Sequence, residues 1–418
     1  MTILAPPFVA AVTAPPVDLG SLTLVLAAAT LGALLSRFHG RIALPTVVLE
    51  IVFGIAIGPQ VLGIAKVDPY INFLSNLGLG MLFFLAGLEV IEKKIPRRAV
   101  RTGTIGWLVS LAIALVVGLV LQEAGLNARW WLIGVALATT ALGTLVPMLS
   151  DAGLLPTPLG AATLGTGVAG EFWPIVFISI FLTGVYGAAT EVVLLIVFCG
   201  VVAFAALAAM RARPPRVVRA IQATVHTTGQ AAVRGSMLIL AALVYLAVQS
   251  GFDFVLGAFA AGLVVGLALD TPSGEGVRVR LEGIGFGVFV PIYFVVTGMT
   301  FDLDSLLTRG GLALAGLFLA LFMLTRGSSA LLWRKELGEQ ATAGLAFFAA
   351  TGLPLIVAIV SIGEERGAID PSVGASLVGA GMLSVLIYPM VAIHIVGRRE
   401  PSGAEAEEFG EFAEEFLG

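Results

Sequence analysis

Residues 158–184 read PLGAATLGTGVAGEFWPIVFISIFLTG, and this stretch decides the fold. As a helix it is long enough to cross the hydrocarbon core of a bilayer, which is about 30 Å thick. Glu171 is its only ionisable side chain and lies about halfway along. Because a charge at that depth is costly, an ionisable residue there marks a functional site by default. The stretch therefore predicts a membrane-spanning helix built around one carboxylate.

The composition extends this prediction to the whole chain. Of the 418 residues, 58% are hydrophobic and 12% are charged, whereas about a quarter of a soluble domain is charged. The charges fall in short clusters between apolar runs of about twenty residues, which suits helices and not the alternating strands of a barrel. The single cysteine and the net charge of -4 give no sign of a metal site or of nucleic-acid binding. We predict an all-α membrane protein that is not an enzyme and needs no cofactor.

Thirteen segments are predicted to span the membrane. They are residues 18–36, 44–62, 71–91, 103–122, 130–150, 158–184, 189–210, 234–249, 253–269, 284–301, 310–333, 341–362 and 373–396. With the N-terminus outside and the C-terminus inside, most of the 23 Lys and Arg residues fall in segments that face the cytoplasm, as the positive-inside rule requires. The predicted location is the cytoplasmic (inner) membrane.

Two of the predicted spans combine hydroxyl groups with helix breakers at mid-depth. The fifth contains Ala138-Thr139-Thr140-Ala141-Leu142-Gly143-Thr144, and the twelfth contains Ala350-Thr351-Gly352-Leu353-Pro354. Breaks at corresponding places in two halves are typical of inverted-repeat transporters, whose unwound backbone coordinates ions. Glu171 in the sixth span and Arg326 in the eleventh are predicted at the same depth. The pattern predicts two crossing broken helices beside a site for a small cation.

Simpler interpretations of the same residues stay open. Glu171 could be a structural acid that only pairs with Arg326. The hydroxyl groups of the fifth span could bond back to their own helix, and the break in the twelfth span could be an ordinary proline kink.

Three further acids lie nearer the cytoplasmic ends of their spans. Glu50, in the second span, either lines an entrance funnel or holds a bend. Asp151, at the end of the fifth span, either attracts cations to the mouth of that funnel or is a solvated helix-end acid. Glu89, where the third span meets a basic loop, is expected to pair with Lys93 or Lys94.

Several motifs resemble those of bacterial monovalent cation:proton antiporters of the cation:proton antiporter-2 type, in the sodium/proton exchanger superfamily. The motifs are PTVVLEIVFGIAIGP at 45–59 with VLG at 61–63, FLAGLE at 84–89, LGAFAAGL at 256–263, and PIYF at 291–294 with GM at 298–299. Their order and spacing hold over residues 18–396.

The resemblance implies thirteen helices in two parts. Residues 103–184 and 310–396 would form a moving core, and residues 18–102 and 185–309 a scaffold that usually forms a homodimer. Residues 1–17 would be an extracytoplasmic segment and residues 397–418 an acidic cytoplasmic tail. Such proteins exchange Na⁺ or K⁺ for protons by an elevator-like movement of the core.

One departure from the family concerns the sixth span. Family members carry two acids, or an amide followed by an acid, where this chain has Gly170 and Glu171. Arg326 matches a Lys or Arg that is frequent in the eleventh span of the family.

With one carboxylate left, we expect Glu171 to bind the proton and the cation in turn, which would make exchange electroneutral at one proton per cation. Thr139, Thr140, Gly170 and Thr351 would complete the site, and Arg326 would compensate charge. Two alternatives are an exporter of an organic or ionophore-bound ion on the same fold, and a membrane sensor or channel that does not exchange ions.

Overall fold

The chain folds into helices in the computed structural model, which describes residues 18–38, 45–92, 95–181, 197–198, 200–204, 207, 230–270 and 274–397. The longer helices are α1 (Leu19–Phe38), α2 (Thr46–Ile57), α3 (Pro69–Glu92), α4 (Arg97–Glu123), α5 (Trp130–Leu137), α6 (Leu142–Asp151), α7 (Pro158–Phe181), α10 (Ala231–Gln249), α11 (Phe254–Leu269), α12 (Glu275–Ile284), α13 (Val290–Thr300), α15 (Arg309–Thr325), α16 (Arg334–Ala349), α17 (Pro354–Glu365) and α18 (Pro371–Val396). The short pieces are a π-helical turn η1 (Gly285–Phe289), α14 (Leu303–Leu306) and the 3₁₀ helix η2 (Gly327–Trp333).

These helices follow the predicted spans closely. Eight helical segments among the described residues are long and apolar enough to cross a membrane, and three shorter apolar helices accompany them. One of the eight, Arg309–Glu365, contains both the eleventh and the twelfth predicted spans. Most of the seventh predicted span, residues 189–210, lies outside the described residues. The predictions for residues 1–17 and for the tail after residue 397 lie outside them as well.

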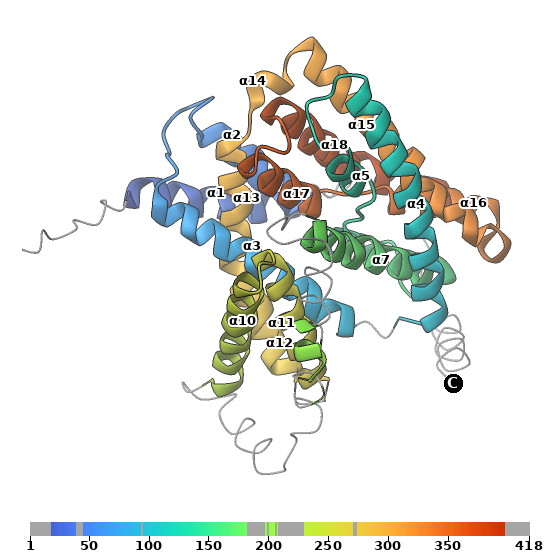
Figure 1. Cartoon of the computed structure of the whole chain (residues 1–418), viewed down its shortest axis with the longest axis horizontal. Helices are drawn as coiled ribbons and strands as arrows, with labels where there is room; N and C mark the ends of the chain where they lie inside the picture. The colour runs from blue at the N-terminus through green and yellow to red at the C-terminus, as the bar shows by residue number, and fades with distance from the viewer. Residues whose placement is uncertain are drawn as a thin grey trace, which may run out of the picture.

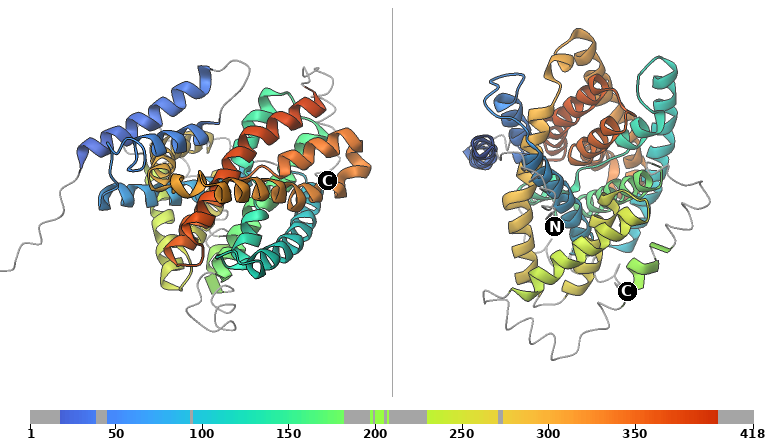
Figure 2. Two further views of the ribbon diagram at one scale, coloured as in Figure 1. Left: turned by 90° about the horizontal axis from the view of Figure 1, so that it is seen from above. Right: turned by 60° about the vertical axis from the view of Figure 1, so that its left-hand side comes forward.

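The helices pack in two groups. In one group, α4 packs against α5 and α7, and α18 packs against α15, α16 and α17. In the other, α3 packs against α11 and α13, and α2 packs between α1 and α13. Figure 1 shows α5 and α17 inside the first group, with α10, α11 and α12 on another side of the molecule. In Figure 2, α1 lies at the edge of the bundle in both views.

The contact between α2 and α13 is a backbone contact. A Cβ atom on Gly54 would lie 2.0 Å from the Val295 carbonyl oxygen, and one on Gly298 would lie 2.1 Å from that of Ile51. Only glycine fits at such a crossing, as in other close helix pairs in lipid. This contact fixes the rotation of α2 and therefore the direction of Glu50, which lies one turn before Gly54.

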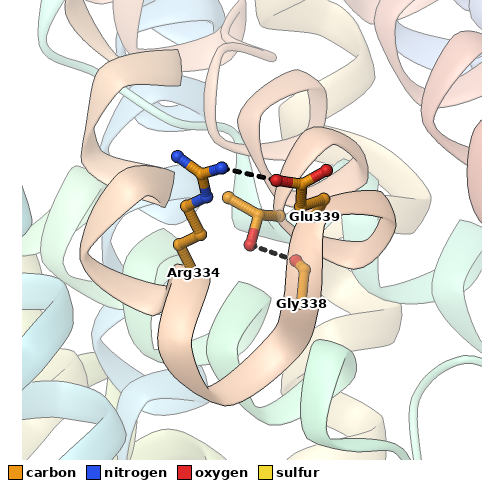
Figure 3. Close-up of polar contacts among 4 residues, drawn as sticks. Arg334, Gly338 and Glu339 are labelled. Carbon is orange, nitrogen blue, oxygen red and sulfur yellow. Dashed lines mark hydrogen bonds and ion pairs between the residues drawn. The ribbon is translucent and has the colours of Figure 1, made fainter.

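The second broken helix begins after a tight turn, shown in Figure 3. Gly338 has a φ angle of 74°, a conformation that glycine adopts readily, and its carbonyl accepts a hydrogen bond from the Thr342 hydroxyl at 2.6 Å. Arg334 forms an ion pair with Glu339 across the turn at 2.5 Å. Both side chains are exposed, so the pair contributes little to stability and the glycine sets the turn.

Candidate functional site

The two predicted breaks meet in the middle of the first helix group. The chain is unwound between α5 and α6 and again between α16 and α17. The backbone N–H of Ala141 in one break donates to the Thr351 carbonyl in the other at 2.8 Å. The Thr140 hydroxyl donates to the Ala349 carbonyl at 2.6 Å. Each break thus satisfies backbone groups of the other, which buried unwound chain requires in lipid.

The carboxylate of Glu171 lies at the start of α6. Its Oε1 atom accepts a hydrogen bond from the Leu142 N–H at 2.8 Å and a longer one from the Gly143 N–H at 3.5 Å. The first N–H groups of a helix have no partner in their own helix, and that end carries partial positive charge. The start of α6 therefore offers both N–H groups and partial positive charge to the Glu171 carboxylate.

Arg326 is fully buried where α15 ends. Its Nε donates to the Thr140 hydroxyl at 2.8 Å, its Nη2 to the Thr166 carbonyl at 3.0 Å, and its Nη1 to the Ser110 hydroxyl at 3.4 Å. All three guanidinium nitrogens therefore have hydrogen bonds to groups other than the Glu171 carboxylate. The arginine connects α4, α7 and the first break, and it reaches the second break through Thr140.

The carbonyl groups of the unwound segments are largely engaged inside the protein. The Trp107 indole donates to the Ala138 carbonyl at 3.1 Å, and the Ser384 hydroxyl donates to the Gly352 carbonyl at 3.0 Å. The Thr140 N–H in turn donates to the Gly170 carbonyl at 3.1 Å. These contacts leave fewer backbone oxygens for a cation than the sequence suggested.

The other residues predicted for the site lie in the protein interior. Thr139, Thr140, Gly170 and Thr351 are all buried. The hydroxyl groups of Thr139 and Thr351 donate to carbonyls of their own helices at 2.9 and 3.0 Å. For Thr139 this is the simpler of the two interpretations given above. The direct role of these four residues as cation ligands stays a prediction.

A cavity of about 670 Å³ opens beside Glu171, between the two helix groups. Gly143, Thr144 and Glu171 line it from one group, and Glu50 and Glu89 from the other. The cavity is otherwise mostly apolar, and within the described residues its carboxylates do not form a cluster of three that could hold a metal ion. It therefore offers a water-accessible route to one face of Glu171.

Glu89 lines the cavity, which the sequence did not predict. Its Oε2 atom lies 3.9 Å from where a Cβ atom on Gly143 would be, so it approaches the same helix start as Glu171. Its expected partners Lys93 and Lys94 lie outside the described residues. Asp151 is the last residue of α6, and its side chain is not among those described.

The sequence also did not predict the roles of Ser110, which accepts from Arg326, and of Ser384, which donates to Gly352. Each is a small hydroxyl residue inside an otherwise apolar span, and both are fully buried. A lone serine in a span is a weak signal, because it more often bonds back to its own helix.

The aromatic residues next to Glu171 are packing residues. Phe172 packs against Phe259 of α11, with ring centres 5.6 Å apart. Trp173 stacks on Trp107 at 6.1 Å and donates to the Thr104 hydroxyl at 3.2 Å. Neither residue is among those that line the cavity.

The two helix groups also meet at the far end of α17, away from the cavity. Arg366, which follows α17, lies 3.1 Å from the carboxylate of Asp253, which caps α11. The carboxylate of Asp253 also accepts a hydrogen bond from the Val255 N–H at 3.1 Å. Helix α17 begins at the cavity with Pro354, so about 18 Å of helix separates the two places.

The sequence of this chain is similar to a transporter family model and to several antiporters. A family model described as "Sodium/hydrogen exchanger, transmembrane" matches residues 25–396. The Na(+)/H(+) antiporter of Enterococcus hirae is 25% identical over 391 residues, which is 89% of this chain and 96% of that protein. The Na(+)/H(+)-K(+) antiporter GerN of Bacillus cereus is 27% identical over 272 residues, which is 64% of this chain and 68% of that protein.

Two further comparisons bear on length and fold. The putative Na(+)/H(+) antiporter YjbQ of Bacillus subtilis is 26% identical over 406 residues, and the match covers 92% of this chain but 64% of that protein. The solved structure of the sodium proton antiporter MjNhaP1 from Methanocaldococcus jannaschii at pH 8 superposes with a TM-score of 0.62 at 19% identity. That match covers 95% of this chain and 99% of the other, so the two share a fold.

Proposed function

The chain belongs to the sodium/hydrogen exchanger family, and on that premise we propose that it exchanges Na⁺ or K⁺ for protons at Glu171. A member of this family is a multi-pass membrane transporter and not an enzyme. The observation that carries the proposal is the position of Glu171: its carboxylate lies at the wall of the cavity, at the start of a half-helix, where the two broken helices meet.

A proton and a cation compete for this carboxylate in the proposed cycle. A bare charge is costly to move through the bilayer, so the core moves when Glu171 carries one of the two ions. One carboxylate then gives one proton per cation and electroneutral exchange. The hydrogen bonds of Arg326 to Thr140, Ser110 and Thr166 support this, because they give the arginine a structural role apart from Glu171.

The two packing groups support an elevator-like movement. The core would comprise α4 to α7 and α15 to α18, and the scaffold α1 to α3 and α10 to α13. The cavity lies between them, and its lining includes Ser36, which precedes Arg37 of a predicted cytoplasmic segment. The structure would therefore represent a state open to the cytoplasm, with the N-terminus outside. The scaffold would form the homodimer contact.

The choice between Na⁺ and K⁺ stays open, because the names of the relatives include both ions. The alternative of a bulky organic substrate has less support, since Phe172 and Trp173 pack against neighbouring rings.

The test is proton flux in proteoliposomes loaded with a pH dye, with Na⁺, K⁺ and Li⁺ added in turn and the voltage clamped or free. We expect cation-triggered proton movement that does not respond to voltage, and its loss in Glu171→Gln. Glu336→Gln, which changes an exposed glutamate of α16, is the matched control. Exchange by a folded Glu171→Gln protein would contradict the assignment of the site.

A further inference from the structure

A second carboxylate in the cavity has no role in the cycle described so far. Glu50 belongs to α2 and lines the cavity from the scaffold side, whereas Glu171 lines it from the core side. Although it borders a cavity, only 3% of Glu50 is exposed. The backbone contact between Gly54 and α13 holds its helix in this orientation.

Within the part of the chain that the structure describes, nothing neutralises the charge of Glu50. No hydrogen bond or ion pair to its carboxylate is found there. Its side chain packs against Gly32 of α1, where a Cβ atom would come within 3.2 Å of the Glu50 Cγ. The cavity residues around it include Leu82, Phe83 and Phe294. An ionised carboxylate in such surroundings costs several kcal/mol unless a proton or a cation accompanies it.

Glu171 has the opposite environment. Two N–H groups at the positive end of α6 stabilise its ionised form. The other ionisable side chain that lines the cavity is Glu89, next to the same helix start. Two carboxylates whose surroundings favour different protonation states can divide the roles of proton donor and proton acceptor.

We propose that Glu50 is a proton-relay residue, which takes the proton that Glu171 releases when a cation arrives and passes it to water at the cavity mouth. This inference rests on the proposed function. Glu50 first gives its own proton to water at the cavity mouth. The O–H bond of Glu171 breaks as the cation binds, and the proton moves through cavity water to the ionised oxygen of Glu50. Glu50 is then protonated again and one proton has left to solvent, so each cation replaces one proton and no other reactant is consumed. The cavity has room for the bridging water.

The first test reads the protonation of Glu50 without transport. A lipophilic carbodiimide such as dicyclohexylcarbodiimide reacts with protonated carboxyl groups in apolar surroundings; the acid adds across one C=N bond and rearranges to a stable N-acylurea, with nothing lost. Purified full-length protein would be labelled between pH 5 and 9 and its peptides weighed by mass spectrometry. Glu336, an exposed residue, is the internal reference.

We expect labelling of Glu50 in both the wild type and Glu171→Gln, decreasing as the pH rises. Absence of label on Glu50 at every pH, or label on Glu89 in its place, would overturn the proposal. Because this measurement needs no transport, it stays readable even if the protein fails to exchange cations, so the two proposals fail separately.

The second test uses the pH profile of exchange. Glu50→Gln should lower the maximal rate roughly tenfold, the size of a modest proton-transfer effect, flatten the pH profile and leave the KM for the cation unchanged. Glu50→Asp should restore part of the rate and the pH dependence, which a purely structural role would not predict. A Glu50→Gln protein with the pH profile of the wild type would contradict a relay.

Discussion

Gly170 and Arg326 share one small space beside the crossing of the broken helices. A Cβ atom at position 170 would lie 2.8 Å from Nη2 of Arg326 and 2.7 Å from the Thr140 hydroxyl oxygen. By the motif resemblance, relatives carry an acid or amide at this position. In this chain the guanidinium group and a threonine occupy the volume that such a side chain would need, which explains why a glycine precedes Glu171.

Gly170→Ala is therefore expected to destabilise the protein. The new methyl group would displace Arg326 or Thr140 from their hydrogen bonds, and overpacking of this kind costs about 1–3 kcal/mol. The measurement is thermal unfolding in detergent. Gly316→Ala on α15, where nothing lies within 4 Å of the added atom, is the control and should be neutral or slightly stabilising. Equal melting temperatures for the two variants would refute the steric argument.

Thr140→Val tests the connection between the two breaks. The substitution removes the hydroxyl that accepts from Arg326 and donates to Ala349, and each buried polar group left without a partner costs about 1–3 kcal/mol. We expect a clear drop in melting temperature together with slower exchange. Thr23→Val removes an exposed hydroxyl that bonds to its own helix, so it should change stability by less than about 0.5 kcal/mol.

Glu171→Asp tests the reach of the carboxylate. Aspartate keeps the charge but is one methylene shorter, so it loses the 2.8 Å contact with the Leu142 N–H. Exchange should slow at least several-fold and keep its dependence on the opposing proton gradient, whereas Glu171→Gln should show none. Wild-type kinetics in the aspartate variant would mean that the contact with α6 does not position the carboxylate for transport.

The ion pair between Asp253 and Arg366 predicts a dependence on the pH of the compartment that it faces. The pair needs ionised Asp253, so it is intact above the pKa of that residue and is lost as the pH falls through it. Acid on that side should therefore release a contact between the proposed core and scaffold and speed departure from this state.

Asp253→Asn should then exchange several-fold faster at neutral pH and lose the response to acid on that side. The check is the exchange rate in liposomes whose inner pH is fixed while the outer pH is varied. It is measured separately for protein inserted in each of its two orientations. Asp304→Asn, at an exposed position, should behave as the wild type. An unchanged acid response in Asp253→Asn would show that other groups cause it.

The sequence predicted the helices well because membrane spans and breaks leave local signals. Long apolar runs located most spans, and the hydroxyl and proline residues around Thr139 and Pro354 located both breaks. The partners of Arg326 could not be predicted. They depend on how α4 and α7 are rotated, and no local signal distinguishes Ser110 from a serine that bonds to its own helix.

The position of Glu89 beside the cavity could not be predicted from the sequence either. A glutamate that faces a basic loop and one that faces the cavity have the same sequence pattern around them, near the end of an apolar span. Its approach to Gly143 arises from the packing of α3 near the start of α6, a relationship between residues more than fifty positions apart.

The backbone contact between α2 and α13 also has a consequence for how such proteins diverge. At Gly54 and Gly298 any larger residue would collide with the opposite main chain, whatever ion the protein carries. Substitutions there would be removed by selection even though neither residue touches the transported ion. If these two positions are always glycine in related proteins, the reason is the close approach of the helices and not the choice of ion. Substitutions that change ion preference would instead be found on the helix faces that border the cavity.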